Sequence, residues 1–433
     1  MGRAFIPQST GCILFQMMGL YTLGLGCYRI LLRLAALFVP KAQLLITGQR
    51  KSELKLKERK QVLHSSSQRI WMHCASLGEF EQGRPVLEKL KKDYPAVFIV
   101  LTFYSPSGFE IRKDTPLADL VLYLPPDYPS ITRQWVKEIA PTVFISVKYE
   151  IWPNLFRSLK KEHVPILMLS AIFREDHRYF GMFSFFWKPI LHCVSYFGVQ
   201  NQTSLDRLTA MGVARAERIG DTRYDRVWSL AQQAKVAEEY VHWLHGRKAL
   251  IIGSSYEREE RVMWATRAHW QKDFVLIIAP HHIDERNVDR LKKMWGQEMV
   301  LATELKTSNS CGEGKSVLLL NTMGELGGLY SLGTLALVGG GWGKGIHNTL
   351  EPAAHGLAVI WGPEDQKFEE ARGLIAAGGG ARFQTEDDMS EWIIRHLEEG
   401  EYWKKMGQNA RNHVIGSIGA TDRFMEVLKS FLK

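Results

Sequence analysis

The chain has 433 residues, 45% of them hydrophobic, and carries a formal net charge of +9. Because a single core rarely grows beyond about 250–300 residues, this length predicts two domains. The positive net charge suits an anionic lipid surface or an acidic substrate. The lack of any nucleic-acid-binding motif argues against a nucleic-acid partner. Five scattered cysteines without a CxxC pair argue against a disulfide framework.

The N-terminal segment is strongly apolar and is followed by basic residues. No charged residue occurs between positions 4 and 28. Arg29 and Arg33 follow, and after a further apolar stretch to Val39 basic residues recur from Lys41 to Lys60. About 20 apolar residues are needed to span a bilayer, and the segment is close to that length. A cleaved signal peptide carries its charge before the apolar run, so we interpret residues 1–40 as a membrane anchor, which either spans the bilayer or lies in its interface. The positive-inside rule then places the rest of the chain in the cytoplasm; a buried helix of the first domain is the alternative.

Short apolar runs alternate with helical patterns along the rest of the chain. The first series of predicted strands covers residues 69–75, 96–102, 120–124, 142–146, 164–170 and 196–199. A charged helical stretch, 226–245, precedes a second series at 249–253, 274–279, 317–320, 334–338 and 358–361, and the tail from 387 reads as helices. Such alternation is typical of parallel βαβ units. We predict an α/β fold with two Rossmann-like domains facing a cleft, at 41–240 and 241–433.

Polar residues follow several of these strands. In open α/β sheets, ligands bind at the carboxyl ends of the strands, in the loops that lead to helices. The first half offers Ser76, Gly78, Glu79, Ser105, Ser107, Lys148 and Glu150, and the second offers Ser254, His281, His282, Met323, Gly324 and Glu325. The adjacent histidines lack the i, i+4 spacing of a metal site, so we interpret them as phosphate or base contacts and expect no metal.

Glu79 is the best candidate for a catalytic group. It lies at the start of a predicted helix directly after an apolar strand. A carboxylate in that position can be desolvated and act as a general base. The alternative is a helix-capping carboxylate that the helix dipole favours.

A glycine-rich turn follows the predicted strand 334–338. Glycines stand at positions 339, 340, 341, 343 and 345, before His347 and Asn348. The spacing fits neither a Walker P-loop nor a dinucleotide fingerprint. Glycines allow close approach of the backbone, and a helix N-terminus attracts anions, so we predict a nucleotide phosphate here, with Glu351 able to meet ribose hydroxyls. The alternative is a tight turn without a ligand.

In combination these motifs resemble one family, the 3-deoxy-D-manno-octulosonic acid (Kdo) transferases of lipopolysaccharide assembly. The likeness runs from about residue 69 to 383. It is carried by Ser-Leu-Gly-Glu at 76–79, Ser-Pro-Ser-Gly at 105–108, Glu-Ile-Trp-Pro-Asn at 150–154, Ala-Pro-His-His at 279–282, Thr-Met-Gly-Glu-Leu at 322–326 and His-Asn-Thr-Leu-Glu-Pro at 347–352.

The resemblance implies an inverting glycosyltransferase of the GT-B fold. The donor would be the cytidine monophosphate ester of Kdo (CMP-Kdo), and the acceptor the bisphosphorylated lipid A precursor at the cytoplasmic face of the bacterial inner membrane, whose anionic lipids the basic surface would meet. Glu79, in the family's Ser-x-Gly-Glu motif, would be the catalytic base, and no cofactor is expected. The resemblance assigns acceptor contacts to Ser76, Gly78, Ser105, Ser107 and Glu150, and donor contacts to Arg223, Ser254, His281, Met323, Gly324, Glu325, Gly345, Asn348 and Glu351.

The chain departs from the family pattern at four positions. Lys148 stands where the family usually has a second acid, His281 where Arg is common, Asn321 in place of Asp, and Ile346 in place of the second Gly of the His-Asn motif. Two other functions remain open: a GT-B enzyme that uses a uridine diphosphate sugar and a different membrane lipid, and a membrane-tethered nucleotide-binding protein without turnover.

Overall fold

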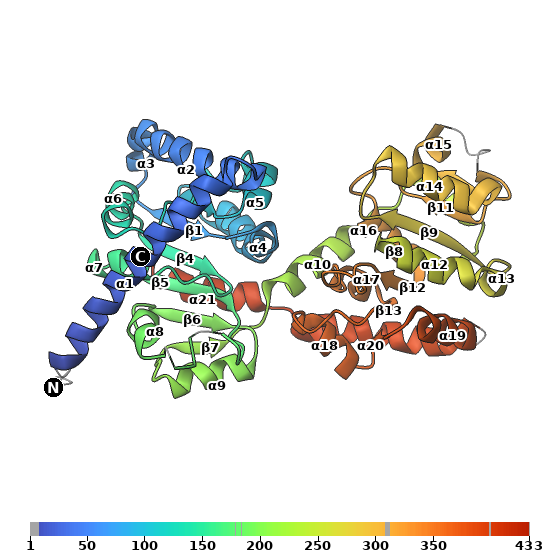
Figure 1. Cartoon of the computed structure of the whole chain (residues 1–433). Coiled ribbons are helices and arrows are strands. Elements are labelled where there is room, and N and C mark those ends of the chain that lie inside the picture. Colours follow the sequence, from blue (N-terminus) through green and yellow to red (C-terminus); the bar gives the residue numbers. More distant parts are fainter. Residues whose placement is uncertain (1–7, 178, 183, 308–311, 398–399, 433) are drawn as a thin grey trace. The chain divides into compact units, whose positions relative to one another are not determined.

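The computed structural model describes residues 8–177, 179–182, 184–307, 312–397 and 400–432. The chain forms two compact units (Figure 1). The first unit comprises Met1–Asp225 together with Gly419–Lys433, and the second comprises Arg226–Ile418. The second unit therefore begins at Arg226 instead of 241, and the final helix, which we expected in the second domain, belongs to the first.

The first unit is built on a parallel sheet in the strand order β3-β2-β1-β4-β5-β6-β7. Its strands are β1 (Arg69–His73), β2 (Phe98–Phe103), β3 (Leu120–Tyr123), β4 (Val143–Val147), β5 (Ile166–Ala171), β6 (Tyr196–Val199) and β7 (Ala216–Arg218). Apart from α10, its helices are α1 (Gln8–Ala35), α2 (Pro40–Glu58), α3 (Lys60–Ser65), α4 (Leu77–Asp93), α5 (Pro106–Arg112), α6 (Pro129–Ile139), α7 (Pro153–Lys161), α8 (Ser184–Leu191), α9 (Gln202–Ala210) and α21 (Ala420–Lys429).

Hydrophobic clusters cover both faces of this sheet, because neighbouring residues of a strand point to opposite faces. In β1, Trp71 belongs to one cluster, whereas Ile70 and Met72 belong to the other. The second cluster also contains Phe424 and Leu428 of α21. Burial of this apolar face explains why the end of the chain returns to the first unit.

The second unit repeats the architecture with the strand order β10-β11-β9-β8-β12-β13-β14, again all parallel. Its strands are β8 (Lys248–Ser255), β9 (Phe274–Pro280), β10 (Met299–Leu301), β11 (Val317–Leu319), β12 (Gly333–Val338), β13 (Ala358–Trp361) and β14 (Gly380–Arg382). The α10 helix (Thr222–Gln233) enters this unit, whose further helices are α11 (Glu238–Leu244), α12 (Glu257–Ala265), α13 (Arg267–Trp270), α14 (Glu285–Trp295), α15 (Ala302–Thr307), α16 (Leu326–Leu329), α17 (Leu350–His355), α18 (Glu369–Ala376), α19 (Glu386–Leu397) and α20 (Gly400–Ser417), with 3₁₀ turns at Gly296–Glu298 and Tyr330–Leu332.

Both sheets reverse their strand order beside their first strand. In the first unit β1 lies between β2 and β4, and in the second β8 lies between β9 and β12. Ligands of doubly wound sheets bind outside the carboxyl ends of strands at such a reversal. The predicted α/β class with two Rossmann-like units is confirmed, and each reversal marks the sheet edge where a ligand is expected to bind.

The N-terminal helix α1 packs along the first unit (Figure 1). Met18 is buried in the core, and the Tyr21 hydroxyl donates a 2.8 Å hydrogen bond to the buried Asp127 carboxylate. Within the described residues, no single helix has both the length and the apolar character needed to cross a membrane, although Gln16–Ala35 and Pro40–Glu58, bent by 118°, meet both requirements as a pair. The spanning anchor therefore stays a prediction.

Candidate functional site

In the first unit, the loops after β1, β2 and β4 lie together at the carboxyl edge of the sheet. Strand pairing places His73 of β1 opposite Thr102 of β2 and Ser146 of β4. The loops that continue from these residues therefore start side by side. They carry the predicted residues Glu79 and Glu150, which are close enough for each carboxylate to affect the other.

Glu79 occupies the first turn of α4 and is almost fully buried, with 6% of its surface exposed. The Ala75 N–H donates to its carboxylate, and the Ser76 N–H stabilises the same charge. Nevertheless its pKa is raised to about 8, because burial outweighs these hydrogen bonds. The Glu150 carboxylate raises the pKa further, and the Lys148 ammonium opposes the shift. This carboxyl therefore exchanges its proton in the range useful for a general base.

Lys148 and Glu150 belong to a strained turn that follows β4. Lys148 adopts a left-handed backbone conformation, with φ of 68°, which a non-glycine residue rarely takes. The Ser146 hydroxyl donates a 2.6 Å hydrogen bond to the Glu150 carbonyl and closes the turn. Lys148 thus contributes a positive charge beside Glu79.

A neutral histidine positions an aromatic side chain at this edge. Burial lowers the pKa of His73 to about 3, so its ring is neutral. The Trp152 indole N–H donates to His73 Nε2 at 3.2 Å, and His73 Nδ1 therefore carries the proton and faces Thr102. The Trp152 ring contacts Tyr104, with ring centroids 5.0 Å apart. No sequence motif pointed to His73 or Tyr104, because both lie within or beside apolar strands.

The predicted serines lie at helix starts beside Glu79. Ser76 is the N-cap residue of α4. Ser105 caps α5, and its hydroxyl oxygen lies 2.8 Å from the Ser107 hydroxyl and accepts the Ser107 N–H at 3.3 Å. A Cβ added to Gly78 would meet nothing closer than the Ser76 hydroxyl at 4.0 Å, so packing does not require glycine at that position. Their contact with an acceptor stays a prediction.

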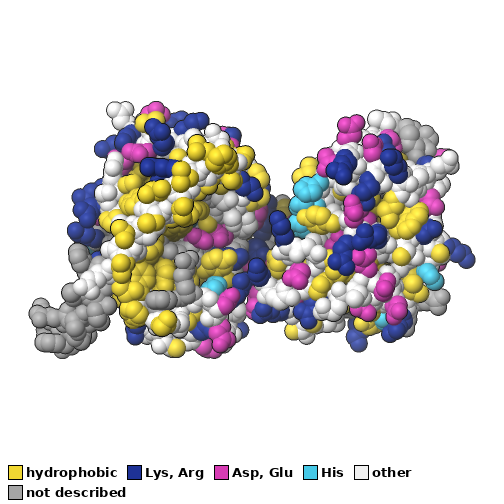
Figure 2. Space-filling view, in the orientation of Figure 1, with side chains coloured by type: hydrophobic (Ala, Val, Ile, Leu, Met, Phe, Trp, Pro, Cys, Tyr) yellow, Lys and Arg dark blue, Asp and Glu magenta, His cyan; other side chains and the backbone are white. Residues whose placement is uncertain are grey.

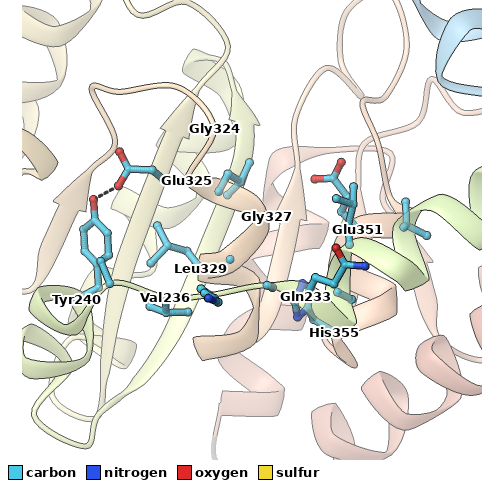
Figure 3. A pocket seen from close by; sticks show the side chains of 17 residues that line it. Gln233, Val236, Tyr240, Gly324, Glu325, Gly327, Leu329, Glu351 and His355 are labelled. Carbon is cyan, nitrogen blue, oxygen red and sulfur yellow. Dashed lines mark hydrogen bonds between the residues drawn. The ribbon is translucent and has the colours of Figure 1, made fainter. Parts of the chain in front are cut away.

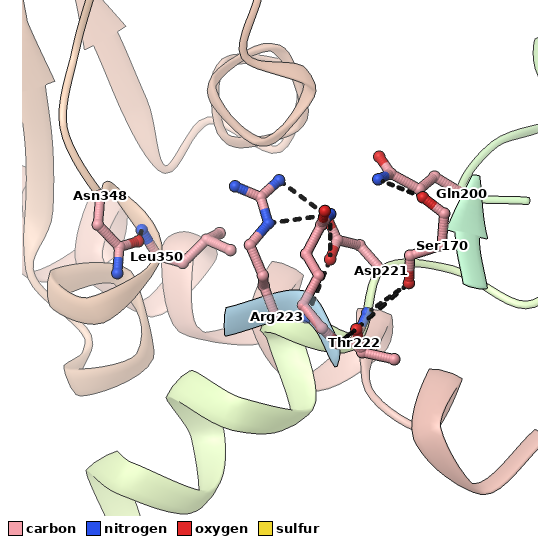
Figure 4. Close-up of polar contacts among 8 residues, drawn as sticks. Ser170, Gln200, Asp221, Thr222, Arg223, Asn348 and Leu350 are labelled. Carbon is pink, nitrogen blue, oxygen red and sulfur yellow. Dashed lines mark hydrogen bonds and ion pairs between the residues drawn. The ribbon is translucent and has the colours of Figure 1, made fainter. Parts of the chain in front are cut away.

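Arg223 also belongs to the first unit, where it is bound to Asp221 (Figure 4). The Arg223 backbone N–H and its guanidinium donate to the Asp221 carboxylate at 2.7–2.9 Å. Burial raises the pKa of Asp221, but the charge and hydrogen bonds of Arg223 more than offset this, and the pKa is lowered. Asp221 therefore fixes the direction of the Arg223 side chain, and contact of Arg223 with the donor stays a prediction.

In the second unit, a pocket of about 620 Å³ brings together three of the predicted donor residues, Gly324, Glu325 and Glu351 (Figure 3). Met323 is not among the lining residues, and 85% of its surface is exposed. Sequence reasoning missed the lining residues Gln233, Val236, Tyr240, Leu329 and His355. The first three come from the connecting helical stretch, whose pattern carried no signal for a ligand.

Glu325 is held by three donors. Lys306 Nζ lies 2.8 Å from its carboxylate, which also accepts hydrogen bonds from the Thr322 and Tyr240 hydroxyls. Partial burial raises the pKa of Glu325, but these donors outweigh it and the net pKa is lowered. This carboxylate therefore stays ionised and joins the loop after β11 to α11 and α15 at the pocket wall.

Glu351 and Asn348 are joined at the start of α17. The Asn348 side-chain amide donates to the Glu351 carboxylate at 2.9 Å. The Asn348 side-chain oxygen Oδ1 accepts the Leu350 N–H at 3.0 Å, and Figure 4 shows Asn348 beside Leu350. Glu351 lines the pocket, whereas Asn348 does not. Asn348 therefore orients Glu351 in this structure, and its own contact with the donor stays a prediction.

Backbone packing accounts for most of the glycine turn. A Cβ on Gly339 would lie 2.0 Å from the Ser254 carbonyl oxygen, and a Cβ on Gly341 would lie 2.4 Å from the Gly362 nitrogen. Gly340 and Gly345 have positive φ angles, 88° and 129°. The Gly340 N–H donates a 2.9 Å hydrogen bond to the buried Glu259 carboxylate. One N–H group of the turn is therefore bound to a carboxylate of the protein.

Aromatic rings gather beside that turn. Tyr256 stacks on His281 and His347, with ring centroids 5.0 and 5.9 Å apart, and its hydroxyl lies 3.2 Å from His347 Nε2. The pKa of His281 is lowered by burial and then by His282, and that of His347 by burial and then by His281. These neutral rings form a stacking surface separate from the lining of the 620 Å³ pocket.

The remaining departures from the family pattern have local explanations. Ile346 is buried and does not have a positive φ, so its backbone does not demand glycine. Asn321 accepts the Thr303 N–H at 3.2 Å and donates to the Thr303 hydroxyl at 2.8 Å, which secures the start of α15. Neither Ile346 nor Asn321 is among the residues that line the 620 Å³ pocket.

Comparison with known proteins identifies the first unit most directly. Residues 41–226 match the family described as 3-Deoxy-D-manno-octulosonic-acid transferase (kdotransferase). This match ends at residue 226, one position after the first segment of the first unit, and contains Glu79, Glu150 and Trp152.

Similarity to whole proteins extends over both units. A 3-deoxy-D-manno-octulosonic acid transferase of Haemophilus influenzae is 28% identical over 84% of this chain and 88% of its own length, and one of Bordetella pertussis is 26% identical over 84% and 87%. Among solved structures, a UDP-GlcNAc 2-epimerase from Neisseria meningitidis matches with a TM-score of 0.59 at 14% identity, covering 84% of this chain and 100% of that one. MurG of Acinetobacter baumannii matches with a TM-score of 0.55 at 11% sequence identity, and the match covers 84% of this chain and 99% of that one. These structures support the GT-B fold alone.

Proposed function

This chain belongs to the 3-deoxy-D-manno-octulosonic acid (Kdo) transferase family and is a glycosyltransferase, and we propose that it transfers Kdo from CMP-Kdo to a lipid A precursor in lipopolysaccharide assembly. The observation that carries the proposal is Glu79, a buried carboxyl with a pKa of about 8 in the part of the chain that matches the family. Transfer to a hydroxyl needs a group that accepts its proton.

The proposed reaction is a single displacement. Glu79 accepts the proton of the acceptor hydroxyl while the hydroxyl oxygen bonds to the anomeric carbon of Kdo. The bond from that carbon to the phosphate oxygen breaks, and cytidine monophosphate leaves with the electron pair. Attack on the face opposite the phosphate inverts the configuration. A base whose pKa lies near the working pH combines availability with proton affinity.

The donor side of the proposal rests on the second unit. A pocket of about 620 Å³ has the size usual for small-molecule sites. The Glu351 carboxylate at its wall is a suitable acceptor for ribose hydroxyls. Tyr240 and Leu329 offer apolar surface to the nucleobase. Within the described part of the chain, the N–H groups of Trp342 and Lys344 lack a hydrogen-bond partner, and we propose them as donors to the leaving phosphate.

The acceptor side rests on helix α1. Its outward residues are apolar, and the Tyr28 hydroxyl lies 3.0 Å from that of Tyr104, which contacts Trp152 at the edge that carries Glu79. The apolar outward face of α1 therefore adjoins the edge that carries Glu79 and suits a lipid acceptor. We propose attachment to the cytoplasmic face of the bacterial inner membrane, where the positive net charge attracts anionic lipids and a bisphosphorylated acceptor.

The test is mass spectrometry of the lipid product after incubation of the purified protein with CMP-Kdo and lipid A precursor. We expect a product heavier than the acceptor by a whole number of Kdo residues, together with release of cytidine monophosphate only when the acceptor is present. Cytidine nucleotides should compete with the donor more strongly than uridine nucleotides. An unchanged acceptor mass with CMP-Kdo, and a heavier product with a uridine diphosphate sugar, would replace this proposal with the other GT-B activity.

A further inference from the structure

A groove of about 790 Å³ lies between α1 and the helices α6 and α7, within the first unit. On the α1 side it is lined by Met18, Gly19, Thr22, Leu23 and Gly26. On the other side it is lined by three basic residues, Arg133, Arg157 and Lys161, all of them exposed. The groove therefore offers positive charge on one wall and mainly apolar surface on the other.

The three cations are available to a ligand. Among the described residues, Arg133, Arg157 and Lys161 form neither an ion pair nor a side-chain hydrogen bond. Polar groups nearby are already satisfied: the Asn154 amide donates to the Asp127 carbonyl at 2.6 Å, and the Thr22 hydroxyl donates to the Met18 carbonyl at 2.8 Å. Unpaired guanidinium and ammonium groups around one groove favour an oxyanion such as phosphate.

The groove adjoins a continuous apolar stripe on the outer face of α1. Leu20, Leu23, Ile30, Leu31 and Leu34 recur at helical spacing, and between 56% and 68% of the surface of each is exposed. Leu37 and Phe38 extend the stripe past the end of the helix. Figure 2 shows hydrophobic side chains gathered along this helix. Exposed apolar surface of this kind marks an interaction site.

The opposite face of α1 is fixed to the protein over several turns. Met18 is buried, Tyr21 bonds Asp127, and the Arg29 guanidinium donates to the buried Gln49 side chain. A helix held along its side presents that outward side, and not its end, to a bilayer. This is the arrangement of an interfacial helix whose apolar face lies at the boundary of headgroups and acyl chains.

We infer that α1 lies in the plane of the membrane and that the groove between α1, α6 and α7 binds the phosphate of an anionic phospholipid headgroup from the same leaflet. Leu23 belongs to both the stripe and the groove, so a lipid whose chains lie beside the stripe has its phosphate within reach of the three cations. The inference does not depend on which sugar the protein transfers.

The first experiment measures cosedimentation of the full-length protein with vesicles of phosphatidylcholine, alone or mixed with phosphatidylglycerol. At low salt, the triple variant Arg133→Gln, Arg157→Gln, Lys161→Gln should lose on the order of 100-fold in binding to the anionic vesicles and little in binding to neutral ones. The matched control is Lys137→Gln, Lys160→Gln, Lys188→Gln, which removes the same charge from α6, α7 and α8 outside the groove. Thermal unfolding checks that both variants fold.

An equal loss in the control variant would show a general charge effect and overturn the site, as would unchanged binding of the groove variant. A raised KM for the lipid acceptor in detergent micelles, with vesicle binding intact, would instead assign the groove to the acceptor. The in-plane position is measured separately with a fluorophore on the exposed Cys27 of α1. Nitroxide lipids labelled near the headgroup should quench it most, and strongest quenching by labels at the bilayer centre would contradict an interfacial helix.

Discussion

Two glutamates, one in each unit, occupy comparable places and have opposite electrostatics. Glu79 follows β1 at the start of α4, and Glu325 follows β11 at the start of α16. Burial dominates at Glu79, where the nearest charges are one acid and one base, and its pKa rises to about 8. At Glu325 a lysine and two hydroxyls outweigh partial burial, and its pKa falls. The first environment prepares a carboxyl to take up a proton, whereas the second keeps a carboxylate charged and fixed.

The largest expected effect is on catalysis. Glu79→Gln removes the proposed base while keeping the size of the side chain, so kcat should fall by about 10²–10⁴-fold. Binding of cytidine monophosphate, measured by calorimetry, should be unchanged. Glu81→Gln is the matched control, because Glu81 lies on the same helix and pairs with Arg84 and Arg112 at the surface. A kcat of the Glu79→Gln enzyme within tenfold of the wild-type value would show that Glu79 is not the catalytic base.

The two glutamates should also affect stability with opposite dependence on pH. The folded-state pKa of Glu79 exceeds its ordinary value of 4.5, so the folded protein binds this proton more tightly, and the free energy of unfolding falls as pH rises from about 4.5 through about 8. Glu79→Gln should abolish that fall and stabilise the protein at pH 9 by a few kcal/mol. Chemical denaturation across this pH range measures the effect. A wild-type curve parallel to that of the variant would disprove the raised pKa.

Glu325→Gln should behave in the opposite sense. Its lowered pKa means that the carboxylate contributes stability above its ordinary pKa of 4.5, and that this contribution is lost as pH falls through the folded-state value. The loss of the charge that Lys306 contacts should cost about 1–2 kcal/mol at neutral pH, and the cost should shrink in acid. The turnover rate with saturating donor should change little. A catalytic loss as large as that of Glu79→Gln would end the distinction between the two sites.

The sequence was sufficient to predict the fold class and most strands, because long apolar runs such as β1 and β9 carry their own signal. It did not predict β7, β10 or β14, which have three residues each and lie at or near the sheet edges. It also did not predict the return of α21, since that depends on which apolar face remains uncovered after the rest of the chain has folded.

The candidate site was predictable to the extent that its residues follow strands. Glu79 and Glu351 were found in this way, whereas Tyr240 was not, because it contacts Glu325 across 85 positions of sequence. The glycine turn was predicted, but the reason for its glycines was only partly predictable. Gly339 has to be glycine because the Ser254 carbonyl oxygen lies against it, and only the folded sheet creates that contact. The opposite pKa shifts likewise depend on burial and neighbours, which no motif encodes.

A smaller effect is expected at the donor pocket. Glu351→Gln should weaken binding of cytidine monophosphate by about tenfold, because an amide is a poorer acceptor for ribose hydroxyls than a carboxylate. Fluorescence titration or calorimetry measures it, and kcat should fall less than KM rises. Glu386→Gln is the control, since Glu386 lies outside the pocket and pairs with Arg258 and Arg261. Unchanged nucleotide affinity would separate this pocket from the donor.

The smallest effects concern the neighbours that tune Glu79, and they should have opposite signs. The Glu150 charge raises the pKa of Glu79, so Glu150→Gln should lower it and move the acid limb of the kcat/KM profile to lower pH. Lys148 lowers that pKa, so Lys148→Gln should move the limb to higher pH. The position of the limb is the readout, because either residue can also change the plateau through acceptor binding. Since both substitutions alter one turn after β4, a disturbance of that turn alone would move both limbs in the same direction. Opposite displacements therefore report charge acting on Glu79, and displacements of equal sign would instead report the disturbed turn and contradict a direct effect of these two charges.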